Sequence, residues 1–598
     1  MDRLIPRSQV PEELTWNLAD IFSSQEEWEA ELRAVTGSID SVTSYRGRLH
    51  EGPQVFLSCL EELEALMGRL IRVASYAGLK LETEATCQSN QAAAARVSAL
   101  RARVEGDTAF VRSEALALPD GTLESYLKDP DLESFRPMIE RMLEEKPHAL
   151  SPETEAVLAS LSEVLEAPSN VYRRSKAADM SFDPVEDSDG RERPMSFPAY
   201  EGRYERAADP VLRRNAFRSF TEGLRGYRNT YGTTWATEVR KNVVMARLRG
   251  FPSAIHMMLS RHQIPGEVYH SIHDVILKEL APHMRRYARL RKRVVGLEEL
   301  LYCDLEAPLD PEYQPGTTYQ EAAEIILGGL EVLGEEYVEI MRSALKDRWI
   351  DRAENAGKTT GAFCNSVYGV HPYIMVTWTD SMRDALVLAH ELGHAGHGVL
   401  SQRYQRLVNC RPSMFFIEAP STTNEILVGS HILRQSEDAR FRRWVIEQLL
   451  MTYHHNFVRH LIEGELQRRV YALAEKEQPV NAGLLSRIQG EILEEFWGDE
   501  LQVDEGARLT WMRQPHYYRG LYPYSYAAGL TVGTEVGRSV VEEGRPAAER
   551  WLEVLKAGGT KKPLELAQMA GVDMSRPDSI KRAVEYVGSL VDEMEKSY

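Results

Sequence analysis

Residues 390–398, His-Glu-Leu-Gly-His-Ala-Gly-His-Gly, place two histidines four positions apart, with a glutamate directly after the first. On an α-helix, side chains four apart share a face and lie roughly 5–6 Å apart at Cβ, so His390 and His394 can reach one metal ion. Glu391 lies beside them, where its carboxylate can touch a metal-bound water without binding the metal. This is the HExxH pattern of catalytic zinc sites.

The alternative is a chance pattern on a helix with surface histidines, in a chain that has 16 of them. The preceding residues argue against it, because residues 385–389 (Ala-Leu-Val-Leu-Ala) are continuously apolar and predict a buried helix whose histidines need partners. Asp380 or Ser381 is expected to cap this helix, with Asp384 in its first turn. The metal-site interpretation is therefore favoured.

Composition limits the classes of partner. The chain has 598 residues, 43% of them hydrophobic, and a net charge of -19, which argues against binding nucleic acid or an anionic membrane through bulk electrostatics. The first residues lack the apolar run of a signal peptide, and no stretch approaches the roughly 18 apolar residues of a membrane span. We therefore expect a cytoplasmic protein.

The apolar spacing predicts a mainly α fold. Residues 1 to about 180 follow a helical period, and a turn-rich segment at 178–203 predicts a β-hairpin with Gly190 at its turn. This hairpin is the expected junction between an N-terminal helical region, 1–198, and a second domain, 199–598. Helical patterns then continue, including the basic residues 284–293, which we interpret as a solvated or internally paired helix face.

Strand signals precede the metal helix. Residues 359–370 and 371–378 are short, rich in β-branched and aromatic residues, and interrupted by glycine and proline. They predict a small sheet beside the metal, and the edge of such a sheet can pair with an extended peptide.

A catalytic zinc site usually has three protein ligands, so one more must be found. His397 shares the helix face, but three ligands in a row along one straight helix cannot surround a tetrahedral ion, and Leu400 occupies the position where a metzincin has its third histidine. A second helix with Glu418 and Glu425, two turns apart, is the remaining source. One carboxylate can bind the metal while the other accepts the N–H of a ligand histidine. His397 is better interpreted as a supporting or packing residue, and Glu425 can also be an ordinary surface residue.

These motifs together resemble the thimet oligopeptidase and oligoendopeptidase F family of zinc metallopeptidases. The resemblance rests on residues 390–397 and 416–425, and on further stretches at 351–364, 371–374, 516–529 and 555–560. It implies one zinc ion bound by His390, His394 and Glu418, with Glu391 as general base and acid. It also implies an elongated helical, zincin-type fold with a deep channel that admits short unstructured peptides, with residues 1–198 forming part of the channel wall.

The tyrosine-rich segment 516–526 has its own chemical interpretation. Attack of water on a peptide carbonyl places charge on the oxygen, and preorganised O–H or N–H donors stabilise that charge. The resemblance implies this role for His516 and Tyr526, and Tyr522 is expected to contact substrate. The simpler interpretation of most tyrosines in this run is packing.

The predicted function is hydrolysis of internal bonds in short peptides. One alternative is a carboxydipeptidase of similar fold, which removes two residues from a free C-terminus, and another is a zinc-containing peptide-binding protein without turnover. The sequence predicts no nucleic-acid or membrane partner, and it leaves the oligomeric state open.

Overall fold

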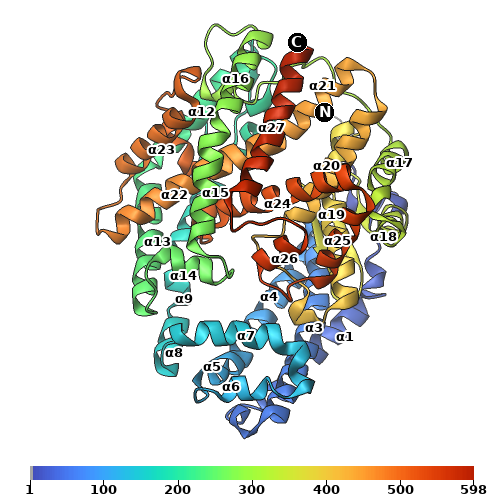
Figure 1. Ribbon diagram of the computed structural model, residues 1–598, viewed down its shortest axis with the longest axis vertical. Coiled ribbons are helices and arrows are strands. Elements are labelled where there is room, and N and C mark those ends of the chain that lie inside the picture. The colour runs from blue at the N-terminus through green and yellow to red at the C-terminus, as the bar shows by residue number, and fades with distance from the viewer. Residues whose placement is uncertain (1–3) are drawn as a thin grey trace.

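Helices make up most of the chain, as the apolar spacing predicts. The computed structural model describes residues 4–598 and contains helices α1 to α27, a two-stranded hairpin and a three-stranded sheet (Figure 1). None of the helices in this described range is long and apolar enough to cross a membrane.

The first seven helices share one apolar core, which includes Trp28, Phe56 and Phe135 and belongs to the blue region of Figure 1. The helices up to residue 174 are α1 (Gln25–Gly37), α2 (Ile39–Thr43), α3 (Pro53–Thr83), α4 (Gln88–Thr108), α5 (Phe110–Ala117), α6 (Thr122–Tyr126), α7 (Arg136–Glu145), α8 (Pro152–Ser160), α9 (Ser162–Leu165) and α10 (Ala167–Arg174).

A second apolar core runs from Tyr172 to Met594. Its helices before the metal helix are α11 (Phe197–Gly202), α12 (Pro210–Gly226), α13 (Arg228–Leu248), α14 (Ala254–Ser260), α15 (Gly266–Glu279), α16 (Ala281–Val295), α17 (Tyr319–Leu330) and α18 (Glu335–Lys346). The later ones are α19 (Met382–Tyr404), α20 (Ala419–Gln435), α21 (Ala439–Tyr453), α22 (His460–Glu475), α23 (Ala482–Trp497), α24 (Tyr522–Glu543), α25 (Arg545–Ala557), α26 (Pro563–Met569) and α27 (Pro577–Ser597).

The predicted small sheet is present beside α19. Strands β4 (Phe363–Ser366) and β5 (Pro372–Met375) pair antiparallel, and β3 (Ile350–Asp351), which the sequence did not signal, pairs parallel with β5. Side chains of β5 alternate between the cores: Tyr373 and Met375 join the first core, and Ile374 joins the second. The sheet therefore separates the two cores.

The predicted hairpin is also present. Strand β1 (Val185–Glu186) pairs with β2 (Glu192–Arg193), and Gly190 has a φ of 73°, the left-handed conformation that a turn glycine supplies. The hairpin is shorter than the turn-rich segment 178–203 that predicted it. The division of the chain at residue 198 stays a prediction.

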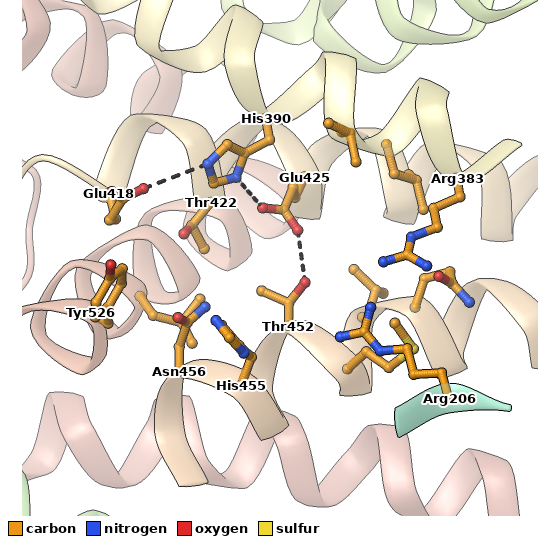
Figure 2. A pocket seen from close by; sticks show the side chains of 16 residues that line it. Arg206, Arg383, His390, Glu418, Thr422, Glu425, Thr452, His455, Asn456 and Tyr526 are labelled. Atoms are coloured by element: carbon orange, nitrogen blue, oxygen red, sulfur yellow. Dashed lines mark hydrogen bonds and ion pairs between the residues drawn. The ribbon is translucent and has the colours of Figure 1, made fainter. Parts of the chain in front are cut away.

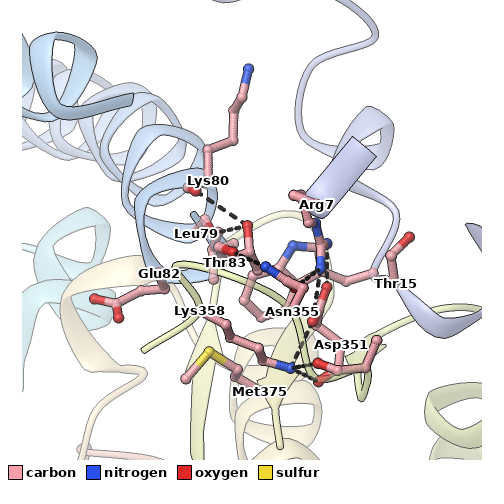
Figure 3. Close-up of polar contacts among 12 residues, drawn as sticks. Arg7, Thr15, Leu79, Lys80, Glu82, Thr83, Asp351, Asn355, Lys358 and Met375 are labelled. Atoms are coloured by element: carbon pink, nitrogen blue, oxygen red, sulfur yellow. Dashed lines mark hydrogen bonds and ion pairs between the residues drawn. The ribbon is translucent and has the colours of Figure 1, made fainter. Parts of the chain in front are cut away.

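The N-terminal segment is tied to the sheet by charged contacts (Figure 3). Arg7 forms an ion pair with Asp351 at the end of β3 and donates to Asn355 over 3.2 Å. Lys358 donates to the same Asp351 carboxylate over 2.8 Å and to the carbonyls of Ala353 and Val376. Because Asp351 and Lys358 are 0% and 3% exposed, this paired charge fixes the loop between β3 and β4.

The basic residues 284–293 lie on α16 and are internally paired. Arg286 contacts Asp592 and Glu595 of α27, and Arg285 donates to the carbonyl oxygen of Phe496. This agrees with the interpretation of a paired helix face.

Candidate active site

Helix α19 carries the HExxH residues through the interior. Ser381 caps it and forms a capping box with Asp384, one of the two predicted caps. At Gly393 the helix touches α20, because a Cβ atom there would lie 2.5 Å from the carbonyl oxygen of Pro420. The glycine between the two histidines therefore lets the second helix approach the metal-binding face.

Helix α20 is held between α19 and α24. Glu418 is its N-cap residue, and a Cβ atom added to Gly529 of α24 would lie 2.9 Å from the Cβ of Glu418. Gly533 and Gly537 follow on the same face of α24 and meet Thr422 and Ile426 of α20 in the same way. This close contact fixes where the Glu418 carboxylate lies.

The structure brings His390, His394 and Glu418 together. One ligand atom from each lies within 4.8 Å of the others, and Oε2 of Glu418 is 3.6 Å from Nε2 of His390 and 3.4 Å from Nε2 of His394. Adjacent ligand atoms around a tetrahedral zinc ion with bonds of about 2.0–2.1 Å are about 3.3 Å apart. The spacing and the two-histidine, one-carboxylate donor set thus fit a zinc ion.

Glu425 contacts the other side of His390 (Figure 2). Its Oε1 is 2.5 Å from Nδ1 of His390, and its Oε2 accepts a hydrogen bond of 3.1 Å from Thr452. Burial alone lowers the pKa of His390, but the hydrogen bond that Glu425 accepts from it and the charges of Glu425, Glu391 and Glu418 raise it to about 10. The site therefore attracts positive charge, as a metal site must.

Glu391 is the least solvated carboxylate of this group. Its residue is 6% exposed, and burial raises the pKa of its carboxyl group, although His390 and His394 oppose the rise. It lies near Cys364 of β4, and no hydrogen bond to its carboxylate is present within residues 4–598. A buried carboxylate without a fixed partner is free to exchange a proton.

Tyr526, His516 and Tyr522 form an aromatic group next to the metal-binding residues. Ring centroids are 5.7 Å apart for His516 and Tyr526, 4.6 Å for His516 and Tyr522, and 5.3 Å for the two tyrosines. Tyr526 lines the same cavity as His390 and Glu418. Burial lowers the pKa of His516 to about 4, so its imidazole is neutral at neutral pH.

Sequence reasoning missed the residue that supports Tyr526. His460 stacks on the Tyr526 ring at 4.3 Å and accepts or donates at both nitrogens, with Glu463 at 2.8 Å and His455 at 3.1 Å. The chain reaches His455 and His460 through a π-helical turn between α21 and α22, for which the sequence carries no motif. Tyr517 and Tyr524, in contrast, are buried packing residues, as the simpler interpretation proposed.

His397 is not one of the three residues whose ligand atoms the structure brings together. It is buried, and burial lowers its pKa to about 3. Its Nε2 has no hydrogen-bond partner among the described residues. The interpretation of His397 as a supporting or packing residue stays a prediction.

A cavity of about 390 Å³ opens beside His390, Glu418 and Tyr526 (Figure 2). Its wall includes Thr452, His455 and Asn456 together with two arginines, Arg206 and Arg383, which sequence reasoning also missed. Arg383 did carry a signal, because a cation in the first turn of a helix opposes the helix dipole and needs a separate reason to be there.

A helical fold with an HExxH helix, a downstream glutamate and a cavity beside them defines a metallopeptidase. A model of peptidase family M3 matches residues 203–586, and a model described as oligopeptidase F matches residues 114–182. The chain belongs to peptidase family M3.

Similar proteins cover the whole chain. It is 32% identical over 596 residues to oligopeptidase PepF of Bacillus subtilis, covering 100% of this chain and 89% of that protein. Group B oligopeptidase PepB of Streptococcus agalactiae is 28% identical, covering 98% of each. Among solved structures, oligoendopeptidase-F from Enterococcus faecium has a TM-score of 0.76 at 26% identity, covering 96% of this chain and 99% of that one. A metal ion and peptide substrates follow from this membership.

Proposed function

We propose that the protein is a zinc-dependent endopeptidase that cleaves internal bonds of short, unstructured peptides. The observation that carries the proposal is the meeting of His390, His394 and Glu418 beside the buried, unbonded carboxylate of Glu391. The relatives named oligoendopeptidase F support the choice of internal cleavage.

His390, His394 and Glu418 would hold one zinc ion, and Glu425 would keep His390 in the tautomer that presents Nε2 to it. Zinc in such a site supplies Lewis acidity and lowers the pKa of a water towards ~7. Glu391 takes the proton of the attacking water and returns it to the leaving amine. Both proton transfers require that no other group holds the Glu391 carboxylate in a hydrogen bond.

Charge that develops on the scissile carbonyl oxygen needs donors. Burial raises the pKa of Tyr526 well above its usual value, so its hydroxyl stays protonated, and the neutral imidazole of His516 can also donate. Tyr522, which packs against both rings, would contact substrate.

The substrate main chain would pair with β4. This strand is at the edge of the sheet order β3-β5-β4, and it packs against α19 where a Cβ on Gly398 would meet Ser366. The channel implied by the resemblance, with residues 1–198 in its wall, is part of the same proposal, and the position of the sheet between the two cores supports it.

Replacement of Glu391 by glutamine tests the mechanism. We expect Glu391→Gln to retain stoichiometric zinc and to lose 10²–10⁴-fold in kcat, the usual contribution of a general base. Metal analysis and peptide hydrolysis measure the two properties, and Glu437→Gln, at an exposed site, is the matched control. Turnover of Glu391→Gln within a few-fold of wild type would remove Glu391 from the mechanism.

A second experiment separates internal cleavage from the carboxydipeptidase alternative. One peptide is digested with a free C-terminus and with an amidated C-terminus, and the products are identified by mass spectrometry. We expect both forms to be cut at internal bonds. Cleavage that occurs only two residues from a free C-terminus would show a carboxydipeptidase instead, and zinc binding without any cleavage would show a binding protein.

A further inference from the structure

The cavity beside His390 has a charged end. Figure 2 shows the guanidinium groups of Arg383, in the first turn of α19, and Arg206 directed into the cavity on the side away from Tyr526. The rest of the wall combines apolar side chains, among them Leu386 and Leu449, with polar ones such as Gln448 and Thr452. The cavity therefore has a mixed, largely apolar wall with two cations on one side.

The charge of this arginine pair is incompletely compensated. Nε of Arg206 donates to Glu306 over 2.8 Å, and Glu306 also pairs with Arg459 at 3.3 Å. No ion pair or hydrogen bond joins the Arg383 side chain to any other residue in the part of the chain that is described. Arg383 is exposed to solvent at the cavity, and partial desolvation followed by the charge of Arg206 lowers its pKa, so an anion between the two guanidinium groups would offset their mutual repulsion.

The position of Arg383 on α19 gives the distance between this arginine pair and His390. Arg383 precedes His390 by seven residues, almost two full helical turns, so both lie on the same face about 10 Å apart along the axis. An extended peptide rises about 3.3 Å per residue. A carboxylate bound by Arg383 would thus belong to a peptide residue two to three positions from the scissile bond.

We propose that Arg383, with Arg206 beside it, forms a subsite for a peptide carboxylate two to three residues from the cleaved bond. This inference rests on the proposed peptidase function and assigns it a substrate feature. The carboxylate is either the C-terminus of a short leaving peptide or the side chain of Asp or Glu, since guanidinium groups bind both in the same way.

Binding measurements test the subsite without turnover. In the Glu391→Gln protein, isothermal titration compares an apolar pentapeptide as a free acid, as an amide, and as amides with Glu at each position in turn. We expect the free acid, or one of the Glu-containing amides, to bind on the order of tenfold more tightly than the plain amide. Arg383→Gln should abolish this difference, and Arg383→Lys should retain part of it.

Arg403→Gln is the matched control, because Arg403 is exposed at the other end of the same helix. The distance from the cleaved bond to the subsite is measured with the wild-type enzyme. KM is compared for peptides with one to five residues after the cleaved bond, each as a free acid and as an amide. We expect the amide to raise KM about tenfold at two or three residues, with little change in kcat.

Equal affinity for acid and amide peptides, with no effect of Glu, would overturn the proposal. A preference that survives in Arg383→Gln would do the same. A preference for the free acid alone assigns the subsite to the C-terminus, and a preference for Glu assigns it to a side chain; both support it. If the carboxylate preference is present but wild-type protein cleaves no peptide, the subsite stands and the proposed hydrolysis fails.

Discussion

Glu425 holds one of the candidate metal ligands from the side opposite the proposed metal. Its carboxylate bridges Nδ1 of His390 at 2.5 Å and the hydroxyl of Thr452 at 3.1 Å. We expect Glu425→Ala to lower zinc affinity 10–100-fold, the usual cost of losing the partner of a ligand histidine. Competition with a chromogenic chelator measures the affinity.

Glu425→Gln and Glu437→Ala complete this comparison. Glutamine keeps an acceptor for His390 but removes the charge, so its zinc affinity should lie between those of Glu425→Ala and wild type. Glu437 is exposed, and Glu437→Ala should bind zinc like wild type. Unchanged zinc affinity in Glu425→Ala, with a native circular dichroism spectrum, would show that packing alone holds His390.

The sequence predicts residues of the site where their spacing follows a helix. His390, His394, Glu418 and Glu425 are recognisable because multiples of about 3.6 residues place them on common faces. His460 and Arg206 come from elements that only tertiary structure brings to the site, so no local pattern marks them. Spacing therefore marks these four residues, the family resemblance assigns the candidate ligands among them, and neither indicates the walls of the cavity.

Helix packing at glycine controls the site at the scale of elements. Gly529, Gly533 and Gly537 recur every four residues on α24, and all three face α20. Their spacing was visible in the sequence, but only the partner helix shows that Gly529 touches Glu418. At Gly529, a larger side chain is therefore excluded by the position of a candidate metal ligand.

Gly529→Ala tests this contact. The new methyl group would lie 2.9 Å from the Cβ of Glu418, so α20 must shift. We expect a loss of about 1–3 kcal/mol in the free energy of unfolding, as for other overpacked cores, together with weaker zinc binding. Urea denaturation and chelator competition measure the two effects.

Gly106→Ala provides the opposite expectation. Gly106 lies in α4, is exposed, and has no atom within 4 Å of an added Cβ. Alanine there should stabilise the protein by roughly 0.5–1 kcal/mol and leave zinc binding unchanged. Equal effects at both glycines would mean that helix propensity, and not contact with Glu418, governs Gly529.

At the scale of the whole molecule, the sheet connects the two apolar cores, whose helices the apolar spacing predicts one by one. Local apolar spacing predicts the helices of both cores, but it cannot show that β5 contributes Tyr373 to one core and Ile374 to the other. Strand β3 has only two residues and pairs with β5 across 24 positions, too short a segment for a period to be seen. Long-range pairing of this kind was the part of the fold that the sequence did not predict.

Burial of neutral histidine also acts on the whole molecule, through the dependence of stability on pH. His273 of α15 is fully buried, and burial followed by the charge of Arg468 lowers its pKa from 6.5 to about 3, against the opposing hydrogen bond from Nδ1 to the carbonyl oxygen of Tyr269. Between these two pKa values the unfolded chain binds a proton that the folded chain does not. The contribution of neutral His273 to the free energy of unfolding is therefore complete above pH 6.5 and is lost as the pH falls towards 3, with a slope of up to about 1.4 kcal/mol per pH unit.

We expect urea midpoints to fall from pH 6.5 to 4.5 in wild type and to fall less steeply in His273→Gln at equal zinc content. His50→Gln, at an exposed histidine, is the control, and identical slopes in wild type and His273→Gln would mean that His273 takes up a proton without unfolding.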